Sequence, residues 1–177
     1  DTYTHGSGLR MMNGSSLALQ YARFAHNHTT AIAAGANPSE PHNPMPFLSL
    51  SHITIHDTRA AECSQLPVGN PLRCVEGDRY YGLGNGLVAV GPADIRIDHF
   101  AISGSRLAGI QVARFGRITA TQGEVHGNAI GVNIQIENYP AELLLGPSVR
   151  YYDNDINLDT QSQPLPDLFD ALPDAPE

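Results

Sequence analysis

Two histidines, His52 and His99, are the residues of this chain that most directly suggest chemistry. They lie 47 positions apart, the same separation as Leu48 and Ile95, as expected for equivalent positions of a repeat. Asp98 immediately precedes His99. A carboxylate that orients an imidazole makes a general base, and two neighbouring imidazoles can ligate a transition metal. We therefore take His52, His99 and Asp98 as candidate catalytic residues; the competing interpretation is a solvated polar ladder at a corner of the fold.

Five further residues are candidates for binding. Two arginines near the histidine positions, Arg96 and Arg23, could hold the carboxylate of a uronate sugar. Arg79, Tyr80 and Tyr81 are consecutive and can stack on and hydrogen-bond a sugar ring or a partner surface. The alternative for this triplet is that its aromatic rings seal a loop onto the body of the protein.

Other polar groups carry weaker signals. A further expected column would stack His56, Ser103, His126 and Arg150, but its serine has no evident oxyanion hole or orienting acid. His26-Asn27-His28 has the alternate spacing of some zinc sites, yet the sequence offers no third ligand. We therefore assign no metal-ligating residues.

No cofactor is expected from the sequence. Calcium is the one ion left open, because Asp153-Asn154-Asp155 together with Asp159 offers several oxygen ligands. These residues lack the ordered spacing and glycine of an EF-hand loop, so a polar turn is the preferred interpretation.

The elements that must position these residues follow a repeat of about 23 residues. Leu87 to Ile110 is 23 positions and Ile110 to Val132 is 22. Separate columns keep common offsets: Leu17 to Leu48 and Phe24 to Ile55 are both 31, and Ile95 to Ile118 and Ile102 to Val125 are both 23, while Val125 to Val149 is 24. A fixed period in the twenties indicates a solenoid.

Within each repeat, apolar and polar residues alternate, as in Ile95-Arg96-Ile97-Asp98 and Val132-Asn133-Ile134-Gln135-Ile136. Period-two alternation predicts short strands with one face inward, and Gly, Asn, Asp or Ser at their ends predict tight corners. The motif Gly-Ile-x-Val, a polar turn, Ile-x-Ile and an Ile/Val followed by Gly-Asn resembles the right-handed parallel β-helix of the pectin-lyase-like superfamily. The predicted fold is an all-β, right-handed parallel β-helix solenoid of about five coils with two inserted loops.

The resemblance implies a fold more than an activity, because the superfamily contains lyases, hydrolases, epimerases, adhesins and phage fibres. In polysaccharide lyases of this fold the glycine-led strands carry the catalytic bases and metal-binding acids. The corresponding outward column here contains no acid, His or Lys: Arg10, Ala33, Val88, Gln111 and Asn133. This composition argues against a calcium-dependent lyase.

The predicted domain spans residues 1–160, and residues 161–177 form an acidic Pro-rich tail. Departures from the 23-residue period place insertions at about 36–47 and 60–83, both rich in loop-forming residues. Leu168, Phe169 and Leu172 of the tail are expected to pack on the last coil; a disordered acidic linker is the alternative.

Cys63 and Cys74 lie within the second insertion, and a pair this close in a turn-rich segment predicts a disulfide. Two buried free thiols are the alternative. A disulfide predicts an extracellular or cell-surface location, with the secreted chain in a processed form or cut from a longer protein.

Charge narrows the range of partners. The net charge is −8 and all ten basic residues are arginines, so no basic surface for nucleic acid can be assembled. No apolar run approaches the roughly 20 residues that a membrane span needs. The expected partners are a polysaccharide or a surface protein, with end-to-end contacts through uncapped coil ends.

Two functions follow. The first is a secreted β-helix module that binds, carbohydrate for example, or acts as a structural or self-assembling surface scaffold, because the sequence lacks a concentrated acid/base set. The second is a carbohydrate-active enzyme, a polysaccharide lyase or glycoside hydrolase, in which His52, His99 and Asp98 act on a sugar held by Arg96 or Arg23.

Overall fold

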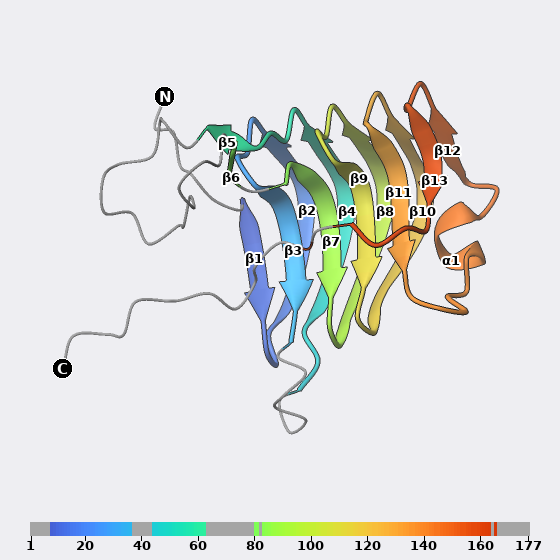
Figure 1. Cartoon of the computed structure of the whole chain (residues 1–177). Coiled ribbons are helices and arrows are strands. Elements are labelled where there is room, and N and C mark those ends of the chain that lie inside the picture. The colour runs from blue at the N-terminus through green and yellow to red at the C-terminus, as the bar shows by residue number, and fades with distance from the viewer. Residues whose placement is uncertain (1–7, 37–43, 63–79, 82, 164, 166–177) are drawn as a thin grey trace.

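The computed structural model describes residues 8–36, 44–62, 80–81, 83–163 and 165, with only the backbone of 61–62 and 80–81. Two parallel sheets dominate it (Figure 1). Sheet A has the order β1 (Leu9–Met12), β3 (Thr30–Gly35), β7 (Asn85–Val90), β9 (Ala108–Ala113), β11 (Ile130–Gln135), β13 (Ile156–Asp159). Sheet B has the order β12 (Val149–Tyr152), β10 (Gly116–His126), β8 (Ala93–Ser103), β4 (Phe47–His56), β2 (Ser16–Ala25).

The chain alternates between the sheets, and we call one strand of sheet A with the following strand of sheet B a coil. This parallel all-β arrangement is compatible with a β-solenoid. Two small elements accompany it: an antiparallel pair of β5 (Ala61–Glu62) and β6 (Tyr80–Tyr81), and the single-turn helix α1 (Glu142–Leu145). None of the described helices is long and apolar enough to cross a membrane.

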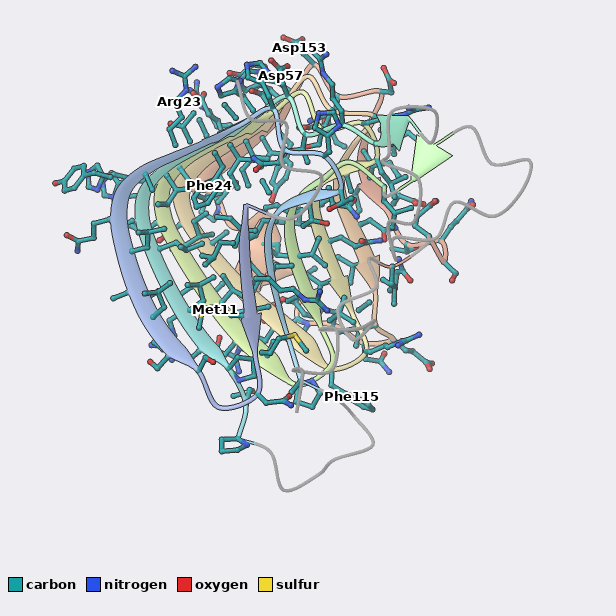
Figure 2. All side chains as sticks on the ribbon, turned by 90° about the vertical axis from the view of Figure 1, so that its left-hand side faces the viewer. Met11, Arg23, Phe24, Asp57, Phe115 and Asp153 are labelled. Atoms are coloured by element: carbon teal, nitrogen blue, oxygen red, sulfur yellow. The ribbon has the colours of Figure 1, made fainter. Side chains whose placement is uncertain are left out.

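The strand register confirms the columns predicted from sequence offsets. Leu17 pairs with Leu48, Leu48 with Ile95 and Ile95 with Ile118. These residues belong to one core between the sheets, in which the Leu, Ile and Val side chains of successive coils stack on one another (Figure 2). Because every second residue of each strand points inward, stacking of the coils joins these residues into one continuous apolar interior.

The last predicted offset is wrong. Val125 pairs with Tyr151, not with Val149, so the repeat is two residues longer here. Helix α1 lies in this connection, and its Leu144 is fully buried in the core. The Tyr151 hydroxyl donates to the carbonyl of Leu144 (3.0 Å), which ties the helix to the coil. The longer connection shifts every polar residue of β12 by two positions relative to the prediction.

Each long strand of sheet B contains one residue with left-handed backbone: Tyr21, His52, His99 and Gln122, with φ of 55°, 55°, 49° and 51°. This residue shifts the alternation by one. In β4, Leu48 and Leu50 point inward before it and Ile53 and Ile55 after it. The strand bends at this position, and the left-handed side chain projects outward. We call these four residues the bend column.

A second left-handed position ends the strands of sheet B. It contains His26, Asp57, Gly104, Gly127 and Asp153, with φ of 55°, 54°, 66°, 62° and 52°. We call it the corner column. Figure 2 shows Arg23, Asp57 and Asp153 along this edge of the solenoid. Just beyond the corner column, the Asn128 side chain accepts from the Ser105 amide (2.8 Å) and donates to the His126 carbonyl (3.0 Å), so it satisfies buried backbone groups between coils.

The outer face of sheet A is covered rather than open. Residues after β13 cross it: Asn133 donates to the carbonyl of Gln161 and Gln135 to that of Gln163, both at 3.0 Å. Leu165 packs against a buried cluster that includes Ala33 and Val88. The column from Arg10 to Asn133 has the predicted register, but it continues to an acid, Asp159, that the sequence alignment left out. The tail residues Leu168, Phe169 and Leu172 lie outside the described residues.

Replacing Gly123 with Ala is expected to destabilise the protein. An added Cβ would lie 2.2 Å from Cε1 of Phe100, whose ring is 5% exposed and fills the space beside this glycine. We expect a loss of about 1–3 kcal/mol in the free energy of unfolding, measured by urea denaturation.

The Gly123→Ala penalty should shrink in a Phe100→Leu background, because the shorter side chain leaves room for the methyl group. Gly146→Ala is the control: Gly146 has a φ of −61°, and its new Cβ would make one tight contact, 3.2 Å from the Glu142 carbonyl oxygen, so a smaller loss than for Gly123→Ala is expected. If the losses in unfolding free energy caused by Gly123→Ala and Phe100→Leu simply add in the double variant, the packing explanation is contradicted.

Candidate functional site

The bend column brings the candidate histidines together. Tyr21 and His52 stack with ring centroids 4.6 Å apart, and His52 and His99 stack at 4.7 Å with an interplanar angle of 4°. The spacing is that of neighbouring parallel strands, which place equivalent side chains about 4.8 Å apart. The stack therefore follows from the register, and its members project from the bend because their backbone is left-handed.

Asp98 and His99 form a hydrogen-bonded dyad. Oδ2 of Asp98 lies 2.5 Å from Nδ1 of His99, and Thr121 donates to Oδ1 of Asp98 at 2.8 Å. The bond from Thr121, with a smaller contribution from His99, holds the pKa of Asp98 below its usual range despite an opposing desolvation effect. An ionised Asp98 accepts a hydrogen bond from the Nδ1–H of His99, which leaves Nε2 as the basic nitrogen.

An open groove of about 630 Å³ runs beside the bend column. One side carries the bend-column residues His52, His99 and Gln122, and the floor includes the small residues Thr54 and Ala101. Its other lining residues are Ile53, Phe100, Gly123, Glu124, Pro147, Ser148 and Arg150. This volume accommodates a small ligand or a few sugar units.

The end of the groove near β12 is held by an ion pair. Arg150 donates to Oε2 of Glu124 at 2.8 Å, and the Tyr152 hydroxyl donates to the same oxygen at 3.1 Å. The Arg150 guanidinium also lies 5.8 Å from the Tyr152 ring centroid. Arg150 is exposed and Glu124 is only half-buried, so the pair contributes little to stability and more to the shape and charge of the groove.

The structure places two of the predicted binding residues, Arg96 and Arg23, away from the residues that line the groove. Arg96 lies before the bend, pairs with Asp94 at 3.7 Å and lies over the Phe47 ring. Arg23 donates from Nε to Nε2 of His56 at 2.8 Å. Neither arginine lines the groove. Arg79, Cys63 and Cys74 lie outside the described residues, as do the side chains of Tyr80 and Tyr81.

Placing Arg150 in the column of His56 is wrong. That column reads His56, Ser103, His126 and Tyr152, and the His126 and Tyr152 rings stack at 4.8 Å. Arg150 instead pairs with Glu124 in the neighbouring column. Sequence analysis missed this arginine as a groove residue because the predicted offset was two residues short. The longer spacing from Val125 to Tyr151, both apolar in character and inward, was the signal that could have revealed it.

Two regions offer metal-ligating atoms. The described part of the chain brings together one set of three His and Asp residues whose ligand atoms lie within 4.8 Å of one another: His26, His56 and Asp57. The carboxylate of Asp159, one of the residues suggested for calcium, accepts hydrogen bonds from the side chains of Asn133 and Gln163 and from the Gln161 amide. Desolvation acts to raise the pKa of Asp159, but the hydrogen bonds together outweigh it and hold the pKa below its ordinary value.

Comparisons with known proteins assign neither a family nor a function to the chain. No model of a known protein family matches the chain, and searches of curated proteins and of solved structures find no similar protein.

Replacing Thr121 with Val is expected to raise the pKa of Asp98 towards its ordinary value, because the carboxylate loses the hydrogen bond that lowers this pKa most. The lowered pKa stabilises the fold above pH ~4, the ordinary Asp value, and this contribution is lost as the pH falls through the folded-state pKa. Carboxyl NMR titration measures the shift directly. Thr119→Val, on the same strand, is the control. An unchanged Asp98 titration in Thr121→Val would contradict the assignment.

Proposed function

We propose that the chain is a right-handed parallel β-helix of the pectin-lyase-like type, with about five coils and two inserted loops, that binds polysaccharide outside the cell. The observation that carries the proposal is the 630 Å³ groove beside the ring stack of the bend column. The parallel sheets and their common register support the fold, and the right-handed preference of parallel crossovers supports its hand. The extracellular location rests on the predicted disulfide of Cys63 and Cys74.

Hydrogen bonding is the main recognition chemistry that this groove offers. The faces of the His52 ring are covered by Tyr21 and His99, so its edge is what a ligand meets. Nδ1 of His52 lies 2.9 Å from the Ser51 hydroxyl and Nδ1 of His99 bonds Asp98. Among the described residues neither Nε2 atom has a hydrogen-bond partner. Two imidazole nitrogens repeated at the strand spacing, comparable with the length of a pyranose ring, suit the hydroxyl groups of a sugar chain lying along the axis.

The ion pair at the end of the groove near β12 complements this edge. Glu124 and Arg150 supply an acceptor and several donors at that end. Polar groups along one side and at one end, with small residues on the floor, are typical of sites that fix a hydroxylated ligand by orientation. The net charge of −8 favours neutral over polyanionic sugars.

Substituting His52 and His99 with Asn is expected to weaken polysaccharide binding. Asn tolerates left-handed backbone, so the bend is retained while the imidazole nitrogens are lost. We expect about a fivefold to tenfold increase in Kd per histidine, equivalent to roughly 1 kcal/mol for a lost hydrogen bond. The measurement is isothermal titration against a panel of neutral and uronate oligosaccharides.

Asp153→Asn provides the matched control, because Asp153 is another left-handed residue and does not line the groove. The proposal is wrong if no oligosaccharide binds, or if the control weakens binding as much as the histidine substitutions do.

A second function, a carbohydrate-active enzyme, is favoured by the Asp98–His99 dyad at the edge of the groove. The dyad has the form of a general base, with Nε2 able to take a proton from a sugar ring carbon or from water. A uronate carboxylate would then be held by Arg150, since Arg96 and Arg23 lie elsewhere.

Activity is tested by unsaturated-uronate and reducing-end assays on the same panel. If the dyad is catalytic, Asp98→Asn and His99→Asn should each lower turnover by about 10²–10⁴, as expected for general-base catalysis. Thr54→Ser, a conservative change on the groove floor, should retain most of it. Binding without turnover for every bound sugar would exclude the enzyme and leave the binding module.

A further inference from the structure

His26, His56 and Asp57 form a compact group at the corner of the first two coils. Oδ2 of Asp57 lies 3.5 Å from Nδ1 of His26 and 3.4 Å from Nδ1 of His56. A tetrahedral zinc ion bound at 2.0–2.2 Å has neighbouring ligand atoms roughly 3.3–3.6 Å apart. Two edges of such a tetrahedron therefore already exist between these atoms. His26, identified in the sequence with His28, finds its partners on the next coil instead.

The backbone holds this group in place. His26 and Asp57 occupy successive positions of the corner column, where both residues have left-handed backbone. The His26 amide donates to the carbonyl of His56 at 3.2 Å, and the Asp57 amide to that of Ser103 at 3.1 Å. Two ligands are thus fixed by coil stacking, and the third, His56, belongs to the adjacent strand β4.

The next coil leaves room for the carboxylate. The residue after Asp57 in the corner column is Gly104, and a Cβ built there would lie 2.8 Å from Oδ1 of Asp57. A residue larger than glycine at position 104 would therefore collide with the Asp57 carboxylate. Gly127 follows in the same column, where a Cβ would meet nothing within 4 Å.

Arg23 is the residue that opposes metal binding. Its Nε donates to Nε2 of His56 at 2.8 Å, so the proton of this imidazole is on Nδ1, facing Asp57. A metal on Nδ1 requires the proton to move to Nε2, where it would face the N–H of Arg23. Arg23 is exposed and can turn into solvent without leaving a cavity. The bound and metal-free arrangements therefore compete for the same imidazole.

We propose that His26, His56 and Asp57 form a divalent transition-metal site, with Zn²⁺ its best-suited ion, and that Arg23 weakens the affinity of this site by holding His56 in the other tautomer. Two imidazole nitrogens and one carboxylate suit Zn²⁺, Cu²⁺ or Ni²⁺ better than Ca²⁺ or Mg²⁺, which prefer oxygen ligands. Three protein ligands leave a fourth position for water or for a group from another molecule. The site lies on the same outer edge as Arg23 in Figure 2 and uses none of the groove residues.

The test is titration of the full chain with Zn²⁺ by calorimetry, and with Co²⁺ by visible absorption, which reports four-coordinate geometry. We expect one saturable site in the wild-type chain. His56→Gln and Asp57→Asn should each weaken it by about tenfold or more, and Asn keeps the left-handed backbone at position 57.

His126→Gln is the matched control. It removes an imidazole from the same column, but its neighbour in the corner column is Gly127 rather than an acid. Zinc affinity should be unchanged in this variant. Equal affinity of His56→Gln and His126→Gln, or no saturable binding in the wild type, overturns the proposal.

Arg23→Gln provides an independent readout, because it removes a side chain that is not a ligand. We expect zinc to bind about tenfold more tightly, the size of effect that groups bonded to metal ligands commonly have. A surface that binds zinc adventitiously through scattered histidines would not respond to this change. Unchanged or weaker binding in Arg23→Gln overturns the assigned role of Arg23, and circular dichroism of each variant shows that the comparison is made between folded chains.

Discussion

The left-handed residue within each long strand of sheet B is the constraint on which the rest of the structure depends. In L-residues this conformation costs roughly 1–2 kcal/mol, and it occurs at Tyr21, His52, His99 and Gln122. In exchange for this strain, the strand can bend while Leu50 and Ile53, on either side of the bend, both remain in the core. The same residue turns the histidine rings outward. Closure of the core and presentation of a polar edge are thus two results of one backbone conformation.

Much of the fold could be predicted from sequence because stacking makes equal offsets visible. The columns through Leu17 and Phe24 emerged from counting alone, and the register agrees with them. The last offset failed at Tyr151 because α1 and the segment before β12 add residues without an apolar pattern of their own. The sequence does not predict that the segment after β13 covers sheet A either. The sheet bonds to the backbone carbonyls of Gln161 and Gln163, and any residue at these two positions offers the same carbonyl.

The sequence predicts the stacked histidines of the candidate site, but it does not predict the other residues that line the groove. His52, His99 and Asp98 follow from column and neighbour relations, both of which are local. Placing Arg150 required the correct register of β12. The group around Asp57 required knowing that His26 and Asp57 share a corner, which depends on φ rather than on hydrophobic pattern. In a sequence, a His or Asp that is needed for its left-handed backbone looks the same as one that is needed for metal binding or catalysis.

The segment that crosses sheet A has a mechanical consequence. Its bonds to Asn133 and Gln135, both at β11, and the contacts of Leu165 with the buried cluster around Val88 are separate points of attachment along the segment. A force on this segment directed away from the sheet would load these interactions singly, as in peeling, and not together, as in shear. The hydrogen bonds between strands would carry little of that load. The segment could then detach at low force while the stacked coils stay intact, which would break the hydrogen bonds that its carbonyls accept from Asn133 and Gln135.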